Sequence, residues 1–471
     1  MLFAFIIYLC FLLIIGIAAH RHSRSERDFA VGNRKLNFWL TSLSAHASDM
    51  SAWLFISLPS IIFLQGMGGC WIALGLIFGM WISWQFIAPR LRRLTEFYDV
   101  YTLSSLIEKH YKTESHWIRV STAVLILVFM THYLTAGLMA VGIVLESSFG
   151  LPYILGVIIA TVIIVTYTYI GGFVTVAWTD FFQAIFLMGV IIAVPVVGYI
   201  AIGGFDSIAT AASERALSIN PFDNFSWLGG VQIILSAIGW GLGYFGLPHV
   251  LTKFLGIQNP DELKKAKYLG ITWQTAVLAG SIAIGLVAVG YFNDRSIDPQ
   301  LLFVEMTTEL FAPFVAGLFI CGLLAANIST MDSQILVSAT LIAEDLYSSA
   351  FPEKNSSQHL LKITRLGVIA TAVVACLLSF DRNATIQETV AYSWAGLGCT
   401  LGPVMLATLF IPRTNAFGAF AGILVGGFVA TFWPMISPSL VGDTFEILAT
   451  VPGYLLALPT IAVVSHLTRE K

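Results

Sequence analysis

The chain is built from long apolar runs separated by short polar segments, and this pattern constrains its fold more than any other feature. A helix needs about 20 apolar residues to cross the hydrocarbon core of a bilayer. Thirteen segments are long and apolar enough to do so: 1–20, 37–64, 68–89, 118–145, 151–170, 173–203, 226–251, 267–292, 311–343, 360–380, 385–412, 414–435 and 446–467. The sequence therefore predicts an all-α polytopic membrane protein with about 13 transmembrane helices.

The composition agrees with this interpretation. Hydrophobic residues make up 57% of the 471 residues and charged residues only 11%, whereas about 25% of an ordinary soluble domain is charged. The net charge of −3 gives no basic surface of the kind that binds nucleic acid. The five cysteines lie in or beside apolar runs without the spacing of a metal or redox motif. Together these features argue against a cytosolic enzyme.

Lys and Arg are unevenly distributed over the segments between the runs. With the N-terminus outside, the inner segments carry 21 of the 24 basic residues, Lys253 among them, and the outer segments carry only Arg215, Arg295 and Arg382. Because cytoplasmic loops are enriched in Lys and Arg, we expect an outside N-terminus and a cytoplasmic C-terminus. Segment 1–20 has no basic residues before its apolar run, so we interpret it as a helix and not as a signal peptide.

Two of the runs contain residues that interrupt a helix. Segment 37–64 carries small and polar residues between Ser44 and Trp53, and segment 226–251 carries four glycines and a proline between Gly239 and Pro248. In a helix interior Gly costs about 1 kcal/mol and Pro about 3. Glycines also allow close helix packing, which is an alternative explanation for each segment taken alone.

The two interruptions lie five spans apart, so the second unit would enter the membrane from the opposite side. Interrupted helices at matching places of two inverted halves are typical of secondary transporters. We therefore expect a single transporter domain over 1–471, with one five-helix repeat over 37–203 and its inverted partner over 226–412. Segment 1–20 precedes the repeats, and two helices over 414–467 follow them.

Three carboxylates lie well inside predicted spans, namely Asp49, Asp180 and Asp332, whereas Glu388 lies near the outer end of its span. Ionisable residues in membrane helices are costly and usually functional, although each could also cap a helix or join two helices. Ser329 and Ser333 are four residues apart and share a helix face. Their hydroxyls, with main-chain carbonyls of an unwound helix, would form an all-oxygen cage for a hard cation such as Na⁺. Bonding of these hydroxyls to their own helix is the alternative.

Several aromatic residues and histidines also lie in the spans. Trp240 and Tyr244 are one helical turn apart in the glycine-rich interruption, which makes them, with Tyr133, candidates for a binding site. Packing is the alternative for these aromatic residues. We interpret His46 and His132 as hydrogen-bonded packing residues, because no further metal ligands stand near them in the sequence.

Five stretches of the chain resemble one family. They read LSAHASDMSAW (43–53), GGFVTVAWTDFFQ (171–183), WGLGYFGLPH (240–249), NISTMDSQIL (327–336) and AYSWAGLGCTLGP (391–403). In this order, over nearly the whole chain, they resemble the solute:sodium symporter family, and within it the bacterial sodium/proline symporters. The resemblance implies an inverted five-plus-five-helix transporter core with broken helices and thirteen spans.

The resemblance also implies roles for particular residues. The main Na⁺ site would include Ala47, Met50, Ala326, Ser329 and Thr330, with Asp49 in support. A second Na⁺ or coupling position would include Asp180, Asp332 and Ser333. The substrate would contact Ser51, Tyr133, Trp240, Tyr244 and Pro248. The sequence departs from the proline symporters at Ala52, where they have Gly, and at Leu247, where Gln occurs.

These features predict Na⁺-coupled symport of L-proline by alternating access in the bacterial plasma membrane. Na⁺ would be the coupling ion, and we expect no organic cofactor and no obligate protein partner. The same mechanism with pantothenate, a sugar or a sialic acid is the first alternative. A channel would need a continuous polar pore, and a membrane enzyme would need a nucleophile with a base and an orienting group; the sequence favours neither.

Overall fold

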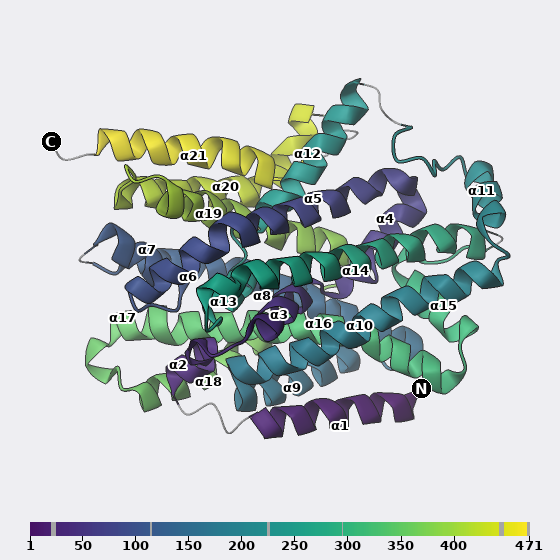
Figure 1. The fold of residues 1–471 in the computed structure, drawn as a ribbon, viewed down its shortest axis with the longest axis horizontal. Helices are drawn as coiled ribbons and strands as arrows, with labels where there is room; N and C mark the ends of the chain where they lie inside the picture. The colour runs from purple at the N-terminus through teal and green to yellow at the C-terminus, as the bar shows by residue number, and fades with distance from the viewer. Residues whose placement is uncertain (20–24, 114, 224–226, 294, 442–446, 469–471) are drawn as a thin grey trace.

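The computed structural model describes residues 1–19, 25–113, 115–223, 227–293, 295–441 and 447–468. Throughout these ranges the regular structure is helical, and one isolated bridge joins Leu36 to Ile257. Most of the long helices run roughly along the long axis of the molecule (Figure 1). The first half of the chain contains α1 (Leu2–Ala19), α2 (Glu26–Val31), α3 (Phe38–Asp49), α4 (Ser57–Gln65), α5 (Cys70–Ile82), α6 (Ala88–Phe97), α7 (Leu103–Tyr111), α8 (Trp117–Phe149), α9 (Tyr153–Gly171), α10 (Phe173–Ala201) and α11 (Phe205–Glu214).

The second half continues in the same way. It contains α12 (Trp227–Gly243), α13 (Pro248–Leu255), α14 (Leu263–Tyr291), α15 (Leu302–Leu310), α16 (Pro313–Thr340), α17 (Ser348–Ala350), α18 (Ser357–Leu378), α19 (Ile386–Phe410), α20 (Ala416–Val441) and α21 (Thr450–Leu467). Two short helical segments of other geometry matter for the site, namely η3 (Ala52–Leu54) and η8 (Leu341–Tyr347). The predicted all-α fold is confirmed.

The helices of the structure give fewer candidate membrane crossings than the thirteen predicted from the sequence. Among the described residues, ten helices are long and apolar enough to span a bilayer, or eleven if the bent pair of α12 and α13 is one span. The stretch Ala52–Phe97 counts once among the ten although it has 46 residues, about 69 Å at 1.5 Å per residue. Residues 20, 226 and 446, where predicted spans end or begin, lie outside the described residues. The number thirteen therefore stays a prediction.

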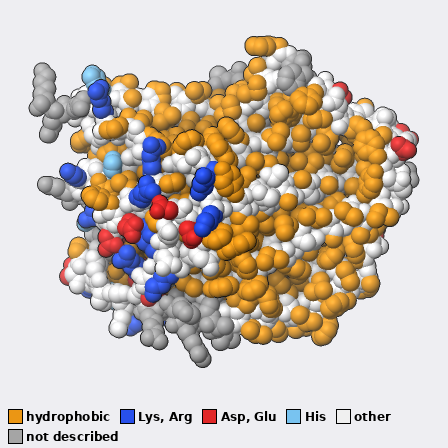
Figure 2. All heavy atoms as spheres, viewed as in Figure 1, with side chains coloured by type: hydrophobic (Ala, Val, Ile, Leu, Met, Phe, Trp, Pro, Cys, Tyr) orange, Lys and Arg blue, Asp and Glu red, His pale blue; other side chains and the backbone are white. Residues whose placement is uncertain are grey.

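The surface is what a lipid environment requires. Large hydrophobic side chains are widely exposed, for example Leu455 at 68%, and contiguous patches of this kind are rare on soluble monomers. In Figure 2 Lys and Arg side chains gather toward the end of the molecule where α6 and α7 lie, and hydrophobic side chains cover most of the remaining face. α1 begins and α21 ends at opposite ends of the bundle (Figure 1), as an odd number of crossings requires.

The most enclosed helices are α16 and α19. In the most apolar 18-residue stretch of each span, 78% of the residues are buried for the span that contains α16 and 83% for α19, compared with 33% for α21. α16 packs against α3, α8, α10 and α18. The centre of the bundle therefore contains α16 and the interrupted helix α3, and polar residues on these two helices face each other there.

Both predicted interruptions are present. α3 ends at Asp49, Met50 leaves the helix at φ −89°, ψ 73°, and Ser51 is extended before the chain resumes in η3 and α4. α12 ends at Gly243, and α13 starts with Pro248 at its first position after a bend of 50°. Because Pro has no N–H, this is where a helix tolerates it best.

The glycines of the second interruption also serve packing. A Cβ atom on Gly243 would lie 1.9 Å from Nε1 of Trp394, and one on Gly246 would lie 2.5 Å from the carbonyl oxygen of Leu397. Both contacts are to α19, so a side chain at either position would push the broken segment away from the centre. The two interpretations of this segment, interruption and close packing, are therefore both correct.

Candidate ion and substrate site

The end of α3 meets the middle of α16 through oxygen atoms. The Ser329 hydroxyl lies 2.9 Å from the carbonyl oxygen of Ala47 and 2.9 Å from that of Ala326, and the Thr330 hydroxyl donates to the Ala326 carbonyl at 3.2 Å. All four residues are buried. Met50 follows at the break, where its N–H donates to the carbonyl of His46. The structure thus brings four of the five predicted Na⁺ ligands into one cluster and places the fifth at the break beside it.

The chemistry of this cluster suits Na⁺. Its atoms are carbonyl and hydroxyl oxygens, which are the ligands that hard cations prefer. Ser329 has a single hydroxyl hydrogen for two carbonyl acceptors, so it can donate to only one of them at a time, while the Ala326 carbonyl also accepts from Thr330. A cation between them would interact with both carbonyls and with the hydroxyl lone pairs. The residues present therefore fit the ion.

Asp49 is fixed by the second interrupted helix. Its Oδ2 accepts a hydrogen bond of 2.5 Å from the Tyr244 hydroxyl, and that hydroxyl in turn accepts one of 3.1 Å from Nε2 of Gln274. The other carboxylate oxygen, Oδ1, is buried without a hydrogen-bond partner in the described part of the chain. Asp49 therefore links the two breaks, a contact that the sequence does not reveal.

A second polar cluster lies beside the first one. Asp180 Oδ2 accepts hydrogen bonds from Ser44 at 2.6 Å, from Ser48 at 3.1 Å and from Nζ of Lys253 at 2.8 Å. The Ser48 hydroxyl is 2.9 Å from that of Ser333. The predicted pair of Asp180 and Ser333 is thus connected through one serine of α3.

Asp332 completes this cluster on α16. Its Oδ2 accepts a hydrogen bond of 2.8 Å from the Tyr167 hydroxyl, and its Oδ1 lies 3.3 Å from the Ser333 hydroxyl. The three residues predicted for the second position therefore belong to one connected network.

Lys253 is the member of this network that the sequence analysis missed. It was counted with the basic residues of an inner segment, but it lies on α13 and is 1% exposed. The sequence does indicate its burial, because Phe254, Leu255 and Ile257, which follow it, are apolar. The hydrophobic segment therefore continues past the point where we ended the span at residue 251.

A narrow cavity, with room for little more than one water molecule, lies next to the break in α3. Two predicted substrate residues, Ser51 and Tyr133, line it, and the Tyr133 hydroxyl is hydrogen-bonded to the Ser51 side chain. The apolar side chains of Ile386 and Val390 on α19 line another part. The cavity is therefore small and mixed in polarity.

Two amide side chains of α16 also line this cavity and were not predicted. Asn327 donates to the carbonyl of Gly137 at 2.6 Å and accepts from the backbone N–H of Ala52 at 3.4 Å. Gln334 is 1% exposed, and neither of its amide atoms has a hydrogen-bond partner among the described residues. Both residues stand within NISTMDSQIL, the segment that the sequence analysis singled out for its hydroxyls.

Trp240 and Tyr244 lie behind the cavity wall. The Trp240 ring packs on Trp53, which lines the cavity, with 5.5 Å between the ring centroids. Trp394 contacts both Trp240 and Tyr244, at centroid distances of 5.7 and 5.0 Å. Trp240 thus supports the cavity through Trp53, Tyr244 packs on Trp394, and neither residue lines the cavity in this structure.

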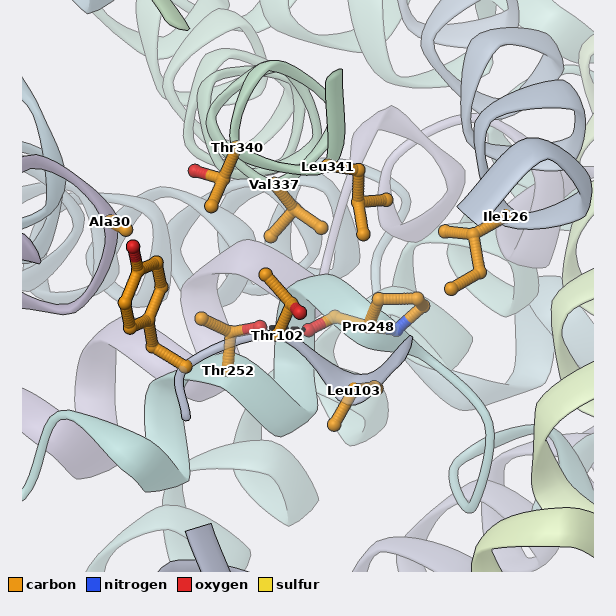
Figure 3. Close-up of a pocket in the computed structure, with 10 residues that line it drawn as sticks. Ala30, Thr102, Leu103, Ile126, Pro248, Thr252, Val337, Thr340 and Leu341 are labelled. Atoms are coloured by element: carbon orange, nitrogen blue, oxygen red, sulfur yellow. Dashed lines mark hydrogen bonds between the residues drawn. The ribbon is translucent and has the colours of Figure 1, made fainter. Parts of the chain in front are cut away.

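Pro248 lies in a different cavity. This cavity has an empty volume of about 310 Å³ and extends from the start of α13 to Tyr101. Figure 3 shows Val337 and Leu341 projecting into it opposite Pro248, whose carbonyl accepts a hydrogen bond of 2.7 Å from Thr252. The predicted substrate residues are therefore divided between two cavities and the aromatic layer beside the first one.

The interpretation of the two histidines as packing residues is confirmed. Trp84 donates to Nε2 of His46 at 3.1 Å and stacks on its ring, and Nδ1 of His132 is 2.8 Å from the carbonyl of Val128. Within the described ranges, no group of three or more His, Cys, Asp and Glu residues could hold a metal ion.

Two interrupted helices that meet at an oxygen-rich centre, inside an apolar helix bundle, define a membrane transporter of the inverted-repeat class. The chain belongs to the sodium:solute symporter family, whose model matches residues 29–426. It is 36% identical over 463 residues to the high-affinity proline transporter PutP of Bacillus subtilis, an alignment that covers 97% of this chain and 96% of that protein. It is 34% identical to the sodium/proline symporter of Salmonella typhimurium, with 99% and 93% covered.

Solved structures show the same fold. A Na⁺-coupled sialic acid symporter in a substrate-bound outward-open state superimposes with a TM-score of 0.84 at 16% identity, covering 98% of this chain and 96% of that chain. MhsT in complex with L-phenylalanine gives a TM-score of 0.54 at 15% identity, covering 90% and 97%. At such low identity these likenesses establish the fold alone.

Proposed function

We propose that the protein is a secondary transporter that couples the entry of Na⁺ to the uptake of L-proline by alternating access. The observation that carries this proposal is the oxygen cluster at which the carbonyl of Ala47, at the break of α3, meets the Ser329 hydroxyl of α16. Relatives that cover nearly the whole chain include a high-affinity proline transporter and a sodium/proline symporter. Ion chemistry and relatives thus support the same function.

Na⁺ would bind to the backbone oxygens of Ala47, Met50 and Ala326 and to the hydroxyls of Ser329 and Thr330. In this position it would fix the end of α3 against α16. Ser51, which lines the substrate cavity, is only four residues after Ala47, so an ordered break also orders one wall of that cavity. Coupling of this kind is reciprocal, because the free energy by which Na⁺ tightens proline binding equals the free energy by which proline tightens Na⁺ binding.

The cavity beside Ser51 is the substrate site that we propose. In this structure it has room for little more than one water molecule, so its lining would move apart to admit the substrate. The relatives that transport proline favour proline over pantothenate, a sugar or a sialic acid. The Gln334 amide can donate to a carboxylate and accept from an ammonium group, while Ile386 and Val390 offer an apolar surface to the proline ring.

The aromatic layer would act from behind this site. Trp240 packs on Trp53, and Trp394 packs on both Trp240 and Tyr244. Pro248 starts the helix that borders the second cavity. We infer that the second cavity is part of the path by which substrate leaves toward the charged end of the bundle. The described cavities are separate from each other, which argues against a channel with a continuous polar pore.

The repeats and the orientation are proposals of the same kind. We assign the inverted repeats to 37–203 and 226–412. We place the charged end of the bundle (Figure 2) in the cytoplasm of a bacterial cell, and with it the C-terminus, because Lys and Arg favour that side. The N-terminus would then be outside. Neither an organic cofactor nor a partner protein is required for the mechanism.

Transport into proteoliposomes tests the function. Purified protein is reconstituted, and uptake of radiolabelled L-proline is measured with an inward Na⁺ gradient and with an equal K⁺ gradient. We expect accumulation only with Na⁺, and inhibition by unlabelled proline but not by pantothenate, glucose or sialic acid. Equal uptake in both gradients would contradict coupling to Na⁺. Stronger inhibition by one of the other solutes would contradict the substrate but leave the mechanism intact.

A further inference from the structure

The second polar cluster already contains a positive charge. Nζ of Lys253 lies 2.8 Å from Oδ2 of Asp180, and the two side chains are 2% and 0% exposed. The ammonium group also lies 5.3 Å from the centre of the Phe173 ring, a distance at which a cation is attracted to an aromatic face. The pair is thus a buried ion pair with a defined geometry.

The surroundings of this pair are those of a cation site. Asp180 of α10 receives hydroxyl groups from Ser44 and Ser48 of α3, and Ser48 contacts Ser333 of α16. Carboxylate and hydroxyl oxygens from three helices would suit Na⁺ if no other cation were present. The Lys253 ammonium approaches the same carboxylate oxygen from a fourth helix, α13.

A second Na⁺ bound to the same carboxylate oxygen would be repelled by this ammonium group. An ion on Oδ2 of Asp180 would lie within a few ångströms of Nζ, and two like charges at that distance repel each other strongly in a buried site. Lys253 lies on α13 and is buried, so its ammonium group cannot move into solvent to make room for an ion. Removal of either partner would leave an uncompensated buried charge.

We propose that the Lys253 ammonium is a built-in cation that takes the place of a second Na⁺, so that the protein binds one Na⁺ per substrate molecule. This inference rests on the proposed function, and it gives Asp180, Asp332 and Ser333 a role different from the one that the resemblance implies. Asp180 then anchors α13 to α10 and α3 close behind the second break, and the ion that couples transport binds only between Ala47 and Ser329.

The number of bound Na⁺ ions tests this inference directly. Purified full-length protein in nanodiscs is titrated with ²²Na⁺, and saturable binding is counted per molecule with and without proline. We expect one Na⁺ in the wild type. In Lys253→Met the Asp180 carboxylate lacks its partner, and we expect a second saturable Na⁺ there.

A matched control is available. Lys267 is 3% exposed, and its Nζ donates to the amide oxygen of Gln85 at 2.5 Å, in a contact without a carboxylate. Lys267→Met should therefore still bind one Na⁺. Lys253→Arg keeps a cation beside Asp180 and should also bind one. If Lys253→Met does not fold, the double variant Asp180→Asn with Lys253→Met removes both charges and should bind one Na⁺.

The outcomes separate this inference from the proposed function. Two Na⁺ ions in the wild type, or one in a folded Lys253→Met protein, would overturn the built-in cation and leave Na⁺-coupled transport in place. A wild type that binds no Na⁺ with or without proline would overturn the proposed function itself. One Na⁺ in the wild type and two in Lys253→Met support both.

Discussion

Tyr244 donates a hydrogen bond of 2.5 Å to Asp49, and this contact joins the two interrupted helices of the protein. Asp49 is the last residue of α3, and Tyr244 is the first residue after α12. Gln274 of α14 holds the Tyr244 hydroxyl from the other side. Because all three groups are buried, bulk water does not compete for these hydrogen bonds.

Removal of the Tyr244 hydroxyl should weaken Na⁺ binding. In Tyr244→Phe the Asp49 carboxylate loses its donor, and a lost hydrogen bond to a charged group costs about 1.5–3 kcal/mol. We expect the Na⁺ concentration for half-maximal proline uptake to rise about 10-fold or more, and Asp49→Asn to be more severe still. Tyr454→Phe is the control, since that buried hydroxyl bonds only to the carbonyl of Leu242. Equal effects in Tyr244→Phe and Tyr454→Phe would contradict the link.

Loss of the Ser329 hydroxyl should affect Na⁺ more than loss of the Thr330 hydroxyl. Ser329 bridges α3 and α16, whereas the Thr330 hydroxyl bonds only within α16 among the described residues. We expect Ser329→Ala to raise the Na⁺ concentration for half-maximal uptake about 10-fold or more, and Thr330→Ala to raise it several-fold. Ser338→Ala removes a buried hydroxyl farther along α16 and should change it little. If all three variants behave alike, Na⁺ does not bind between α3 and α16.

Gln334 should determine the affinity for proline. Replacement by leucine keeps the approximate size of the side chain and removes both unpaired amide atoms, so the substrate loses its polar partner in the cavity. We expect Gln334→Leu to weaken proline binding about 10-fold or more, while Na⁺ binding measured without proline is unchanged. Gln183→Leu is the control, because this buried amide bonds Tyr8 away from the cavity. Unchanged proline affinity in Gln334→Leu would place the substrate elsewhere.

Much of this arrangement follows from local sequence. The breaks at Met50–Ser51 and before Pro248 are visible because residues that disfavour a helix interrupt apolar segments, and Ser329 and Ser333 share the face toward α3 because they are four residues apart. The partner of Asp180 is not visible in this way. Lys253 is 73 positions away in the chain, and only the packing of α13 against α3 brings the two charges together.

The division of the substrate residues has a similar cause. Trp240 and Pro248 are close in sequence, but the bend between α12 and α13 separates them. Trp240 packs behind the first cavity on Trp53, and Pro248 lines the second cavity. Gln334 lies in the same segment of α16 as the predicted hydroxyl ligands. The polarity of a single residue does not show which side of this helix faces a cavity. Local patterns therefore identify the helices of the site, and tertiary packing decides which side chains line it.

Glu26, in the short helix α2 outside the spans, should make stability depend on pH. Tyr101 is hydrogen-bonded to the carboxylates of both Glu26 and Glu344, but it has one hydroxyl hydrogen, and Arg119 pairs with Glu344. Burial, and then repulsion by Glu344, raises the pKa of Glu26 from its ordinary 4.5 to about 8. The folded state therefore keeps a proton that the unfolded state releases above pH 4.5.

The contribution of this proton is full below about pH 4.5 and decreases as the pH rises toward 8. We expect the wild type in detergent to lose stability between pH 5 and 8, which is measured as a falling Tm. Deprotonation of Glu26 lowers the free energy of unfolding by at most about 1.4 kcal/mol per pH unit. Glu26→Gln, which stays neutral, should fall less. Glu353→Gln replaces an exposed glutamate and should follow the wild type. Parallel pH profiles for wild type and Glu26→Gln would refute the assignment.

The central claim is that Na⁺ at the junction of α3 and α16 prepares the cavity beside Ser51 for proline. The most direct measurement is equilibrium binding of radiolabelled proline to the purified protein, at zero and at saturating Na⁺ with ionic strength held constant by K⁺. We predict that Na⁺ tightens proline binding at least 10-fold, and that Ser329→Ala shifts this effect to higher Na⁺ concentrations. Proline affinity that is independent of Na⁺ would contradict the account.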